Sequence, residues 1–356
     1  MTKNNSNNSQ SPRKIAKKRF KTFKKKINKA CKLPNLENSD KDTILSFCGY
    51  GDPCEEILAS NMPLRWEAAQ ALRNAMIEHR KNRSSNDREY YLGTFIDDSG
   101  ITSDRVPLVR QRELRDKTYR VLKTAGLHAI GVIEAHPLMN YPGGGDGRSL
   151  LFHVHFIAWS DNVLSPGDLE KSVNNSRGWS CQLGASPAKI QALPPKKKDL
   201  SQVSYYLLKP PHSAKNRMAA NDNPDAFRLM DTIKGYRPEL ALRVIEAYSQ
   251  IDLRDTIFGV NEGADIRQKV REEITKFHSE ALKSGSPIPK SFDIWLYWYN
   301  LRQRFGSDNF LPFRFQGNSV FPSPAKSRPS RHRRRPGNNQ RRLAKRRVKK
   351  LSRRPL

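Results

Sequence analysis

Apolar residues in the middle of the chain fall into runs of strand length separated by turn signals. Aromatic and β-branched residues fill 90–96, and this run ends at the turn-forming sequence DDSG. Two further apolar runs occupy 128–135 and 150–159, and the second is apolar enough to lie at the centre of a sheet. Between the first two runs, residues 104–125 repeat apolar positions every three to four residues, which predicts a helix that ends at Gly126.

Weaker patterns continue this order beyond residue 160. They predict a short helix at 166–175, and then a pair of strands, one around Cys181 and one at 189–194. A second helix is predicted at 201–209, where two consecutive prolines stop it. This alternation over residues 88–222 predicts one α+β domain, a sheet with helices packed on one side.

Helical periodicity dominates on both sides of this domain. Residues 41–87 form a helical lead-in, with one apolar stripe over 65–79. Residues 223–320 are expected to form an α-helical region, with helices in the segments 237–251, 264–285 and 292–305.

The two ends of the chain are too polar and basic to belong to a core. Residues 1–40 carry a lysine-rich arm, which could be a basic helix on DNA but which we interpret as a solvated, disordered arm. Residues 321–356 form an Arg/Lys-rich tail that we expect to be disordered. The formal net charge is +30, so nucleic acid is the expected partner. Charge alone does not separate an enzyme from a purely structural binder.

Cysteine usage and hydropathy bear on the compartment. Four scattered cysteines and no secretory leader fit a reducing, bacterial cytoplasm. Cys48 and Cys54 could supply two zinc ligands, but a structural zinc site needs four, so we expect free thiols. No apolar run approaches the ~20 residues of a membrane span, so we expect no membrane partner.

Two histidines and a glutamate are the strongest candidates for metal ligands. His153 and His155 lie two apart in the central strand, and so their side chains project from one face. Glu134 lies in the preceding apolar strand, where a carboxylate is costly unless it binds a cation or pairs with an arginine. We therefore expect a two-histidine, one-carboxylate site, and we place His136, just before Pro137, in a loop.

A third element supplies a candidate nucleophile. Tyr206 lies three residues before Lys209, and Tyr205 lies four before it, so either tyrosine can share a helix face with the lysine. A tyrosine hydroxyl becomes a useful nucleophile when a metal polarises the target phosphate and a cation stabilises the phenolate. The competing interpretation is that these tyrosines are ordinary core contacts.

Together these motifs resemble the HUH endonuclease superfamily, and most closely the rolling-circle replication initiators of bacterial plasmids and phages. The resemblance covers about residues 88–212: YLGTFID is similar to the family's first motif, HVHFIAW to its HUH motif and YLLK to its YxxK motif. It implies a central antiparallel, ferredoxin-like sheet. It also implies Mg²⁺ or Mn²⁺ held by Glu134, His153 and His155, with attack by Tyr206 on DNA and charge stabilisation by Lys209. Tyr205 could serve a second transfer.

The resemblance also implies substrates and partners. The expected function is to nick single-stranded or hairpin origin DNA, leaving a 5′-phosphotyrosine and a free 3′-OH for a host polymerase. A host helicase must supply unwinding, because the sequence carries no P-loop. A single-tyrosine transposase or a relaxase is the nearest alternative, and a non-enzymatic basic nucleic-acid-binding protein is the second.

Overall fold

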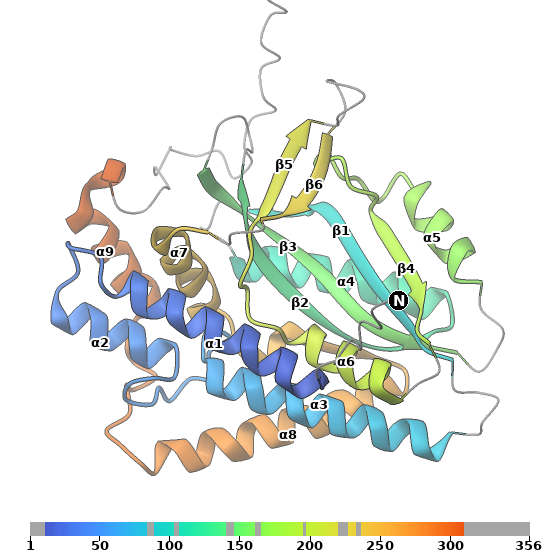
Figure 1. Cartoon of the computed structure of the whole chain (residues 1–356), viewed down its shortest axis with the longest axis horizontal. Helices are drawn as coiled ribbons and strands as arrows, with labels where there is room; N and C mark the ends of the chain where they lie inside the picture. Colours follow the sequence, from blue (N-terminus) through green and yellow to red (C-terminus); the bar gives the residue numbers. More distant parts are fainter. Residues whose placement is uncertain are drawn as a thin grey trace, which may run out of the picture. The chain divides into compact units, whose positions relative to one another are not determined.

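A computed structural model describes residues 11–83, 89–102, 107–139, 146–160, 165–194, 197–219, 227–232 and 236–309 of the chain. Within these residues, three helices precede the first strand, and two helices follow the last one (Figure 1). The order is α1 (Pro12–Ala30), α2 (Asn38–Phe47), α3 (Met62–Asn82), β1 (Tyr91–Thr102), α4 (Pro107–Thr124), β2 (His128–Met139), β3 (Asp146–Trp159), α5 (Pro166–Asn174), β4 (Ala188–Ala192), α6 (Lys197–Leu207), β5 (Lys215–Ala219), β6 (Phe227–Asp231), α7 (Pro238–Ser249), a 3₁₀ turn (Leu253–Thr256), β7 (Ile257–Val260), α8 (Gly263–Leu282) and α9 (Ile294–Asn309). The basic tail predicted at 321–356 lies outside the described residues.

The strands form one curled, mixed sheet in the order β4-β1-β3-β2-β5-β6, with β7 also paired to β2. All the central pairings are antiparallel, as expected, but β2 and β5 run parallel. The fold is therefore α/β with a mixed sheet. The strand expected around Cys181 is wrong, because residues 181–187 form turns.

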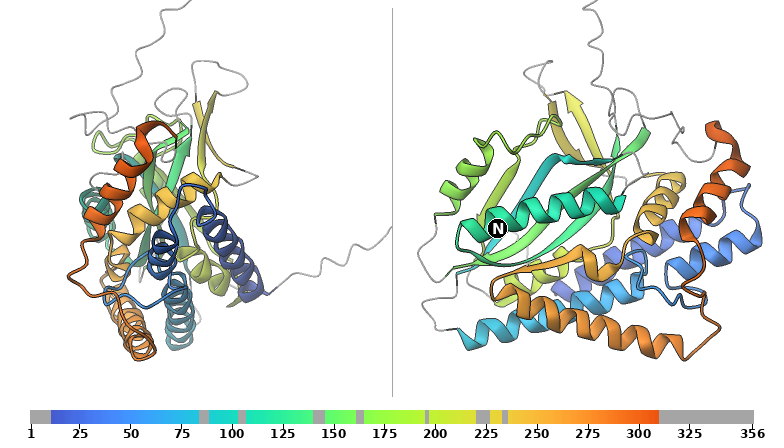
Figure 2. Two further views of the ribbon diagram at one scale, coloured as in Figure 1. Left: turned by 90° about the vertical axis from the view of Figure 1, so that its left-hand side faces the viewer. Right: turned by 180° about the vertical axis from the view of Figure 1, so that it is seen from behind.

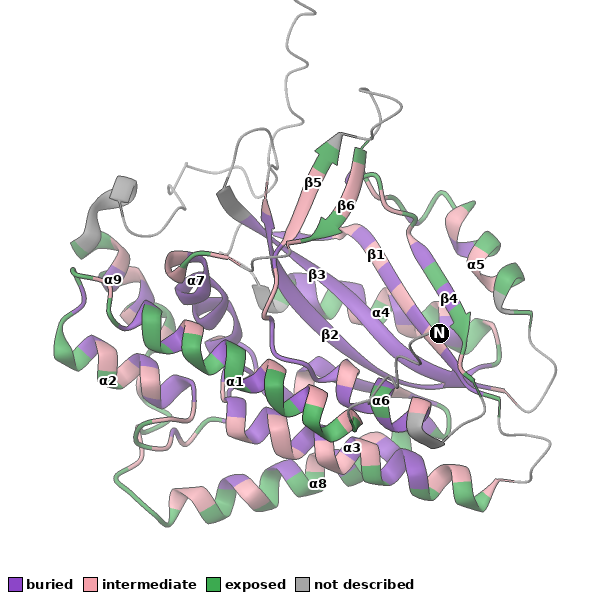
Figure 3. Ribbon diagram, in the orientation of Figure 1, coloured by how far each residue is buried: buried purple, intermediate pink, exposed green. Residues whose placement is uncertain are grey.

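Helices cover both faces of this sheet, so the expectation of helices on one side is wrong. α4 crosses the reverse face, as the view from behind in Figure 2 shows, and α6 lies against the front face. The physical reason lies in β2 and β3, whose residues are buried on both faces along nearly their whole length (Figure 3). Such strands need a layer of cover on each side.

The outer edge of β2 is shared between distant parts of the chain. β7 pairs with residues 129–132, and β5 pairs with residues 138–139. Between them the Ala135 N–H donates to the Tyr248 hydroxyl of α7 over 2.7 Å. A side chain thus completes the ladder where no strand is paired, as a buried backbone group requires.

The predicted helices of the flanking regions are present. The stripe at 65–79 lies in α3, which packs between α6 and α8, and the three later patterns are α7, α8 and α9. Residues 12–30, interpreted from sequence as a solvated arm, instead form α1, whose apolar side is buried against α6 and α7. None of the described helices is long and apolar enough to cross a membrane.

An ion pair clamps α4 to the reverse face of β1. Lys117 Nζ lies 2.6 Å from Asp97 Oδ2, and the buried Asp97 also accepts hydrogen bonds from the backbone N–H groups of Ser99 and Ser180. Burial raises the pKa of this carboxyl, but the ion pair and the hydrogen bonds outweigh it and leave the pKa below its ordinary value.

We expect Asp97→Asn to lower the free energy of unfolding by about 3 kcal/mol at pH 7, because it leaves Lys117 without its partner. A carboxyl group whose pKa is lower in the folded than in the unfolded protein stabilises the fold at pH values above its unfolded pKa, which is about 3.9 for aspartate. The difference between variant and wild type should therefore shrink as the pH falls below about 4. Urea unfolding at pH 7 and at a pH below about 4 measures this difference in the free energy of unfolding. The exposed Asp116→Asn is the control. A difference independent of pH would contradict the ion pair.

Candidate metal centre

The pairing of β2 with β3 brings the candidate ligands together. Glu134 is directly opposite His153 in the antiparallel register, and His155 lies two residues further along the same face of β3. Strand β1 flanks β3 on the other side, with Thr94 opposite His155. The pairing of β2 with β3 therefore places all three side chains at one point of the sheet, as the sequence predicted.

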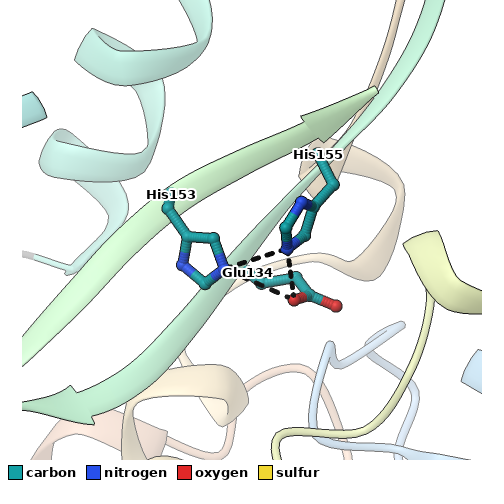
Figure 4. Close-up of side chains that lie close together, drawn as sticks. All are labelled: Glu134, His153 and His155. Carbon is teal, nitrogen blue, oxygen red and sulfur yellow. Dashed lines mark hydrogen bonds and ion pairs between the residues drawn. The ribbon is translucent and has the colours of Figure 1, made fainter. Parts of the chain in front are cut away.

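Three ligand atoms converge there (Figure 4). His153 Nε2 and His155 Nε2 are 3.1 Å apart, and Glu134 Oε2 lies 3.6 Å and 3.5 Å from them, respectively. All three side chains are buried, Glu134 completely. Among the described residues, this is the one group of three or more histidine, cysteine and acidic side chains close enough to hold a metal ion.

The protonation states suit cation binding. Burial is the main cause that lowers the pKa of both His153 and His155 well below the ordinary value. The neighbouring histidines add to it for His153, and the charges of Lys209 and Lys215 add to it for His155, so both imidazoles are neutral at pH 7. Burial raises the pKa of Glu134, but Lys209 and His136 more than offset this and keep the carboxylate ionised. Neutral imidazole and ionised carboxylate are the forms that bind metals.

Atoms without partners also indicate a cation. Thr94 Oγ1 lies 2.9 Å from His155 Nδ1. This contact engages Nδ1 and directs Nε2 of the same ring into the site. Glu134 Oε1 is buried and has no hydrogen-bond partner among the described residues. Two nitrogens and a carboxylate oxygen fit a divalent metal ion, and this donor set does not by itself select one metal. The cysteines play no part: Cys31, Cys48, Cys54 and Cys181 are free thiols, as expected.

Tyr206 reaches the same point from α6. Its hydroxyl lies 3.4 Å from His155 Nε2, and the two rings meet edge to face. Lys209 is buried just beyond the end of α6, with Nζ 2.5 Å from Glu134 Oε2 and 3.7 Å from the centre of the Tyr206 ring. The lysine therefore bridges the ligand cluster and the tyrosine. Pro210 and Pro211 follow it and stop the helix there.

Tyr205 points elsewhere. Its ring stacks on Trp66 of α3, with centroids 5.6 Å apart and planes 9° from parallel, and the side chain is buried. Adjacent helical residues diverge by about 100°, so one of the two tyrosines had to turn away from the sheet. Tyr205 is the core contact, and Tyr206 is the residue at the site.

One site residue was misassigned from the sequence. His136 was expected in a loop, but β2 continues through Pro137 to Met139, and so His136 is buried on the same face as Glu134. Its Nδ1 lies 2.7 Å from the Ser213 carbonyl oxygen, and its Nε2 lies 3.5 Å from Glu134 Oε2. The two-residue spacing from Glu134 was the signal that could have placed it.

Comparisons with protein-family models, with curated proteins and with solved structures found no match to this chain.

We expect Mn²⁺ to raise the melting temperature of the protein by roughly 5 °C when its concentration is about a hundredfold above Kd, because the ion binds the folded state alone. The shift should disappear in His153→Ala and in His155→Ala, measured by thermal unfolding. His128→Ala, at the far end of β2, should keep it. Circular dichroism confirms that each variant folds. An undiminished shift in both site variants would disprove the ligand assignment.

Proposed function

We propose that this chain is a metal-dependent DNA-nicking enzyme of the HUH type that starts rolling-circle replication. The observation that carries the proposal is the convergence of a tyrosine hydroxyl on a buried two-histidine, one-carboxylate cluster. The three parts come from different elements, Glu134 from β2, the histidines from β3 and Tyr206 from α6. A basic protein that only coats nucleic acid has no need of such a site.

The proposed chemistry is a transesterification. Glu134, His153 and His155 would hold Mg²⁺ or Mn²⁺, which when bound withdraws charge from a phosphate oxygen. The Tyr206 oxygen attacks the phosphorus in line, a phosphorus–oxygen bond to tyrosine forms, and the bond to the 3′ oxygen breaks. Tyr206 loses its proton to solvent and the departing 3′ oxygen gains one. The products are a 5′-phosphotyrosine and a free 3′-OH.

Positive charge beside Tyr206 supports this role. Burial raises the pKa of the Tyr206 hydroxyl to about 12, and Glu134 contributes in the same direction, whereas Lys215 and Arg19 act to lower it. The phenol is thus protonated at neutral pH, and its attack depends on cations that stabilise the developing negative charge. Lys209 Nζ lies 3.7 Å from the centre of the Tyr206 ring, closer than the Arg19 guanidinium carbon at 5.5 Å.

The partners follow from the products. A free 3′-OH primes a DNA polymerase, and a host helicase would supply unwinding, so the proposed substrate is single-stranded or hairpin origin DNA. A single-tyrosine transposase or a relaxase performs the same transesterification and is the nearest alternative. Cleavage specificity for a replication origin distinguishes the initiator from both.

We expect Tyr206→Phe to abolish the covalent protein–DNA adduct, because it removes the attacking oxygen. The full chain is incubated with Mn²⁺ and a labelled single-stranded origin library, and the adduct is detected on a denaturing gel. Tyr205→Phe is the matched control: its ring stacks on Trp66, so this variant should form the first adduct normally.

Mass spectrometry of the trapped peptide identifies the tyrosine independently. A nucleotide on Tyr205 with none on Tyr206 would reverse the assignment and leave the metal site intact. Absence of any adduct from the wild-type chain, with Mn²⁺ bound, would rule out the nicking activity itself.

A further inference from the structure

Helix α1 carries an unusual concentration of positive charge. Ten of its nineteen residues are lysine or arginine, and none is acidic. At about 100° per residue the helix sets five exposed lysines along one outward stripe, namely Lys14, Lys18, Lys21, Lys25 and Lys29. Successive members lie three or four residues apart, a spacing at which like charges destabilise a helix.

The helix forms because its other side is anchored. Phe20, Phe23 and Ile27 are buried, and α1 packs along α6 and α7. Ser11 caps the N-terminus through a hydrogen bond from the Lys14 N–H, and Pro12 occupies the first turn. Packing thus offsets the repulsion and holds the lysines in a fixed row.

No described carboxylate pairs with a lysine or arginine of α1. The lysines on its flanks lie over aromatic rings instead, Lys17 over Trp66 and Lys24 over Tyr50. Those of the outward stripe project into solvent. A fixed row of uncompensated cations attracts a polyanion over a Debye length.

One flank of the helix faces the candidate site. The Arg19 guanidinium carbon lies 5.5 Å from the centre of the Tyr206 ring. Further along the same flank, Lys26 donates to the Tyr236 carbonyl oxygen, which fixes that flank against the segment leading into α7. In Figure 1, α1 runs across the front of the molecule beside α6, the helix that carries Tyr206.

We propose that the exposed face of α1 binds the sugar–phosphate backbone of a single DNA strand and leads it to Tyr206, with Arg19 on the phosphate nearest the tyrosine. The choice of DNA rests on the proposed nicking function, whereas the surface itself rests on the geometry of α1. From Lys14 to Lys29 the stripe is about 22 Å long. That length follows several phosphates of one strand, whose spacing is about 3.4 Å along the axis of a duplex.

A membrane surface does not fit this helix. A helix that lies on a membrane inserts its apolar side among the lipids. The apolar side of α1 is occupied, since Phe20, Phe23 and Ile27 are buried in the protein core. A single row of cations also matches one phosphate backbone, whereas a duplex presents two.

Binding tests the surface without any need for cleavage. The full chain carrying Tyr206→Phe is titrated in EDTA with a fluorescent, unstructured 20-nucleotide DNA at several salt concentrations. The triple variant Lys14→Ala, Lys18→Ala, Lys21→Ala should weaken binding at least tenfold and flatten the slope of log K against log salt by about 2, since each phosphate contact contributes about 0.7.

The matched control removes three exposed lysines away from α1, through Lys276→Ala, Lys283→Ala and Lys290→Ala. We expect less than a threefold loss from it. Equal losses in the two triples would overturn the proposal, and so would an α1 triple that loses affinity for a 20-base-pair duplex as strongly as for the single strand.

Arg19 is tested by the rate of adduct formation at saturating DNA. Arg19→Ala should slow it at least tenfold and Arg19→Lys should restore most of it, while Arg13→Ala, on the flank that meets Gln70 of α3, should not change it. An unchanged rate in Arg19→Ala would remove Arg19 from the proposal. If the wild-type chain forms no adduct but the lysine triple still loses binding, the nicking function fails and the surface stands.

Discussion

A carboxylate buried at the centre of a sheet is the constraint on which this structure depends. Glu134 is fully enclosed, and a buried charge without compensation costs several kcal/mol. Lys209 Nζ lies 2.5 Å from Glu134 Oε2, and an imidazole nitrogen of each of three histidines lies about 3.5 Å from the same oxygen. The end of α6 must therefore pack against the middle of β2. The same packing brings Tyr206 to the ligand cluster.

The local part of this arrangement could be predicted. The two-residue period of a strand gives the shared face of His153 and His155, and the pairing of consecutive strands brings in Glu134. The three-residue spacing of Tyr206 and Lys209 also lies within one segment. His136 was missed because Pro137 suggested a strand end, whereas β2 continues past it. Each of these predictions used residues of one segment or of two consecutive strands.

The rest depended on contacts between distant residues. The ring of Tyr205 stacks on Trp66, which lies in a helix well over a hundred residues earlier in the chain. Nothing in the sequence near Tyr205 indicates this contact. The charge of α1 suggested a solvated arm, and only the burial of Phe20 and Phe23 against later helices reverses that interpretation. β7 joins the sheet from a region whose sequence pattern is helical. Periodicity shows that such faces are apolar, but it does not identify their partners.

The outer edge of β2, which pairs with β7 at one end and with β5 at the other, affects folding during synthesis of the chain. Its pairing partner β7 and the sealing hydroxyl of Tyr248 both lie more than a hundred residues downstream. At roughly 5–20 residues per second, a ribosome needs on the order of ten seconds to deliver them after β2 has emerged. For that interval the nascent chain presents an unpaired, mostly apolar strand edge, the kind of edge to which other chains add. A chaperone that holds this edge during synthesis would favour the native sheet over aggregation.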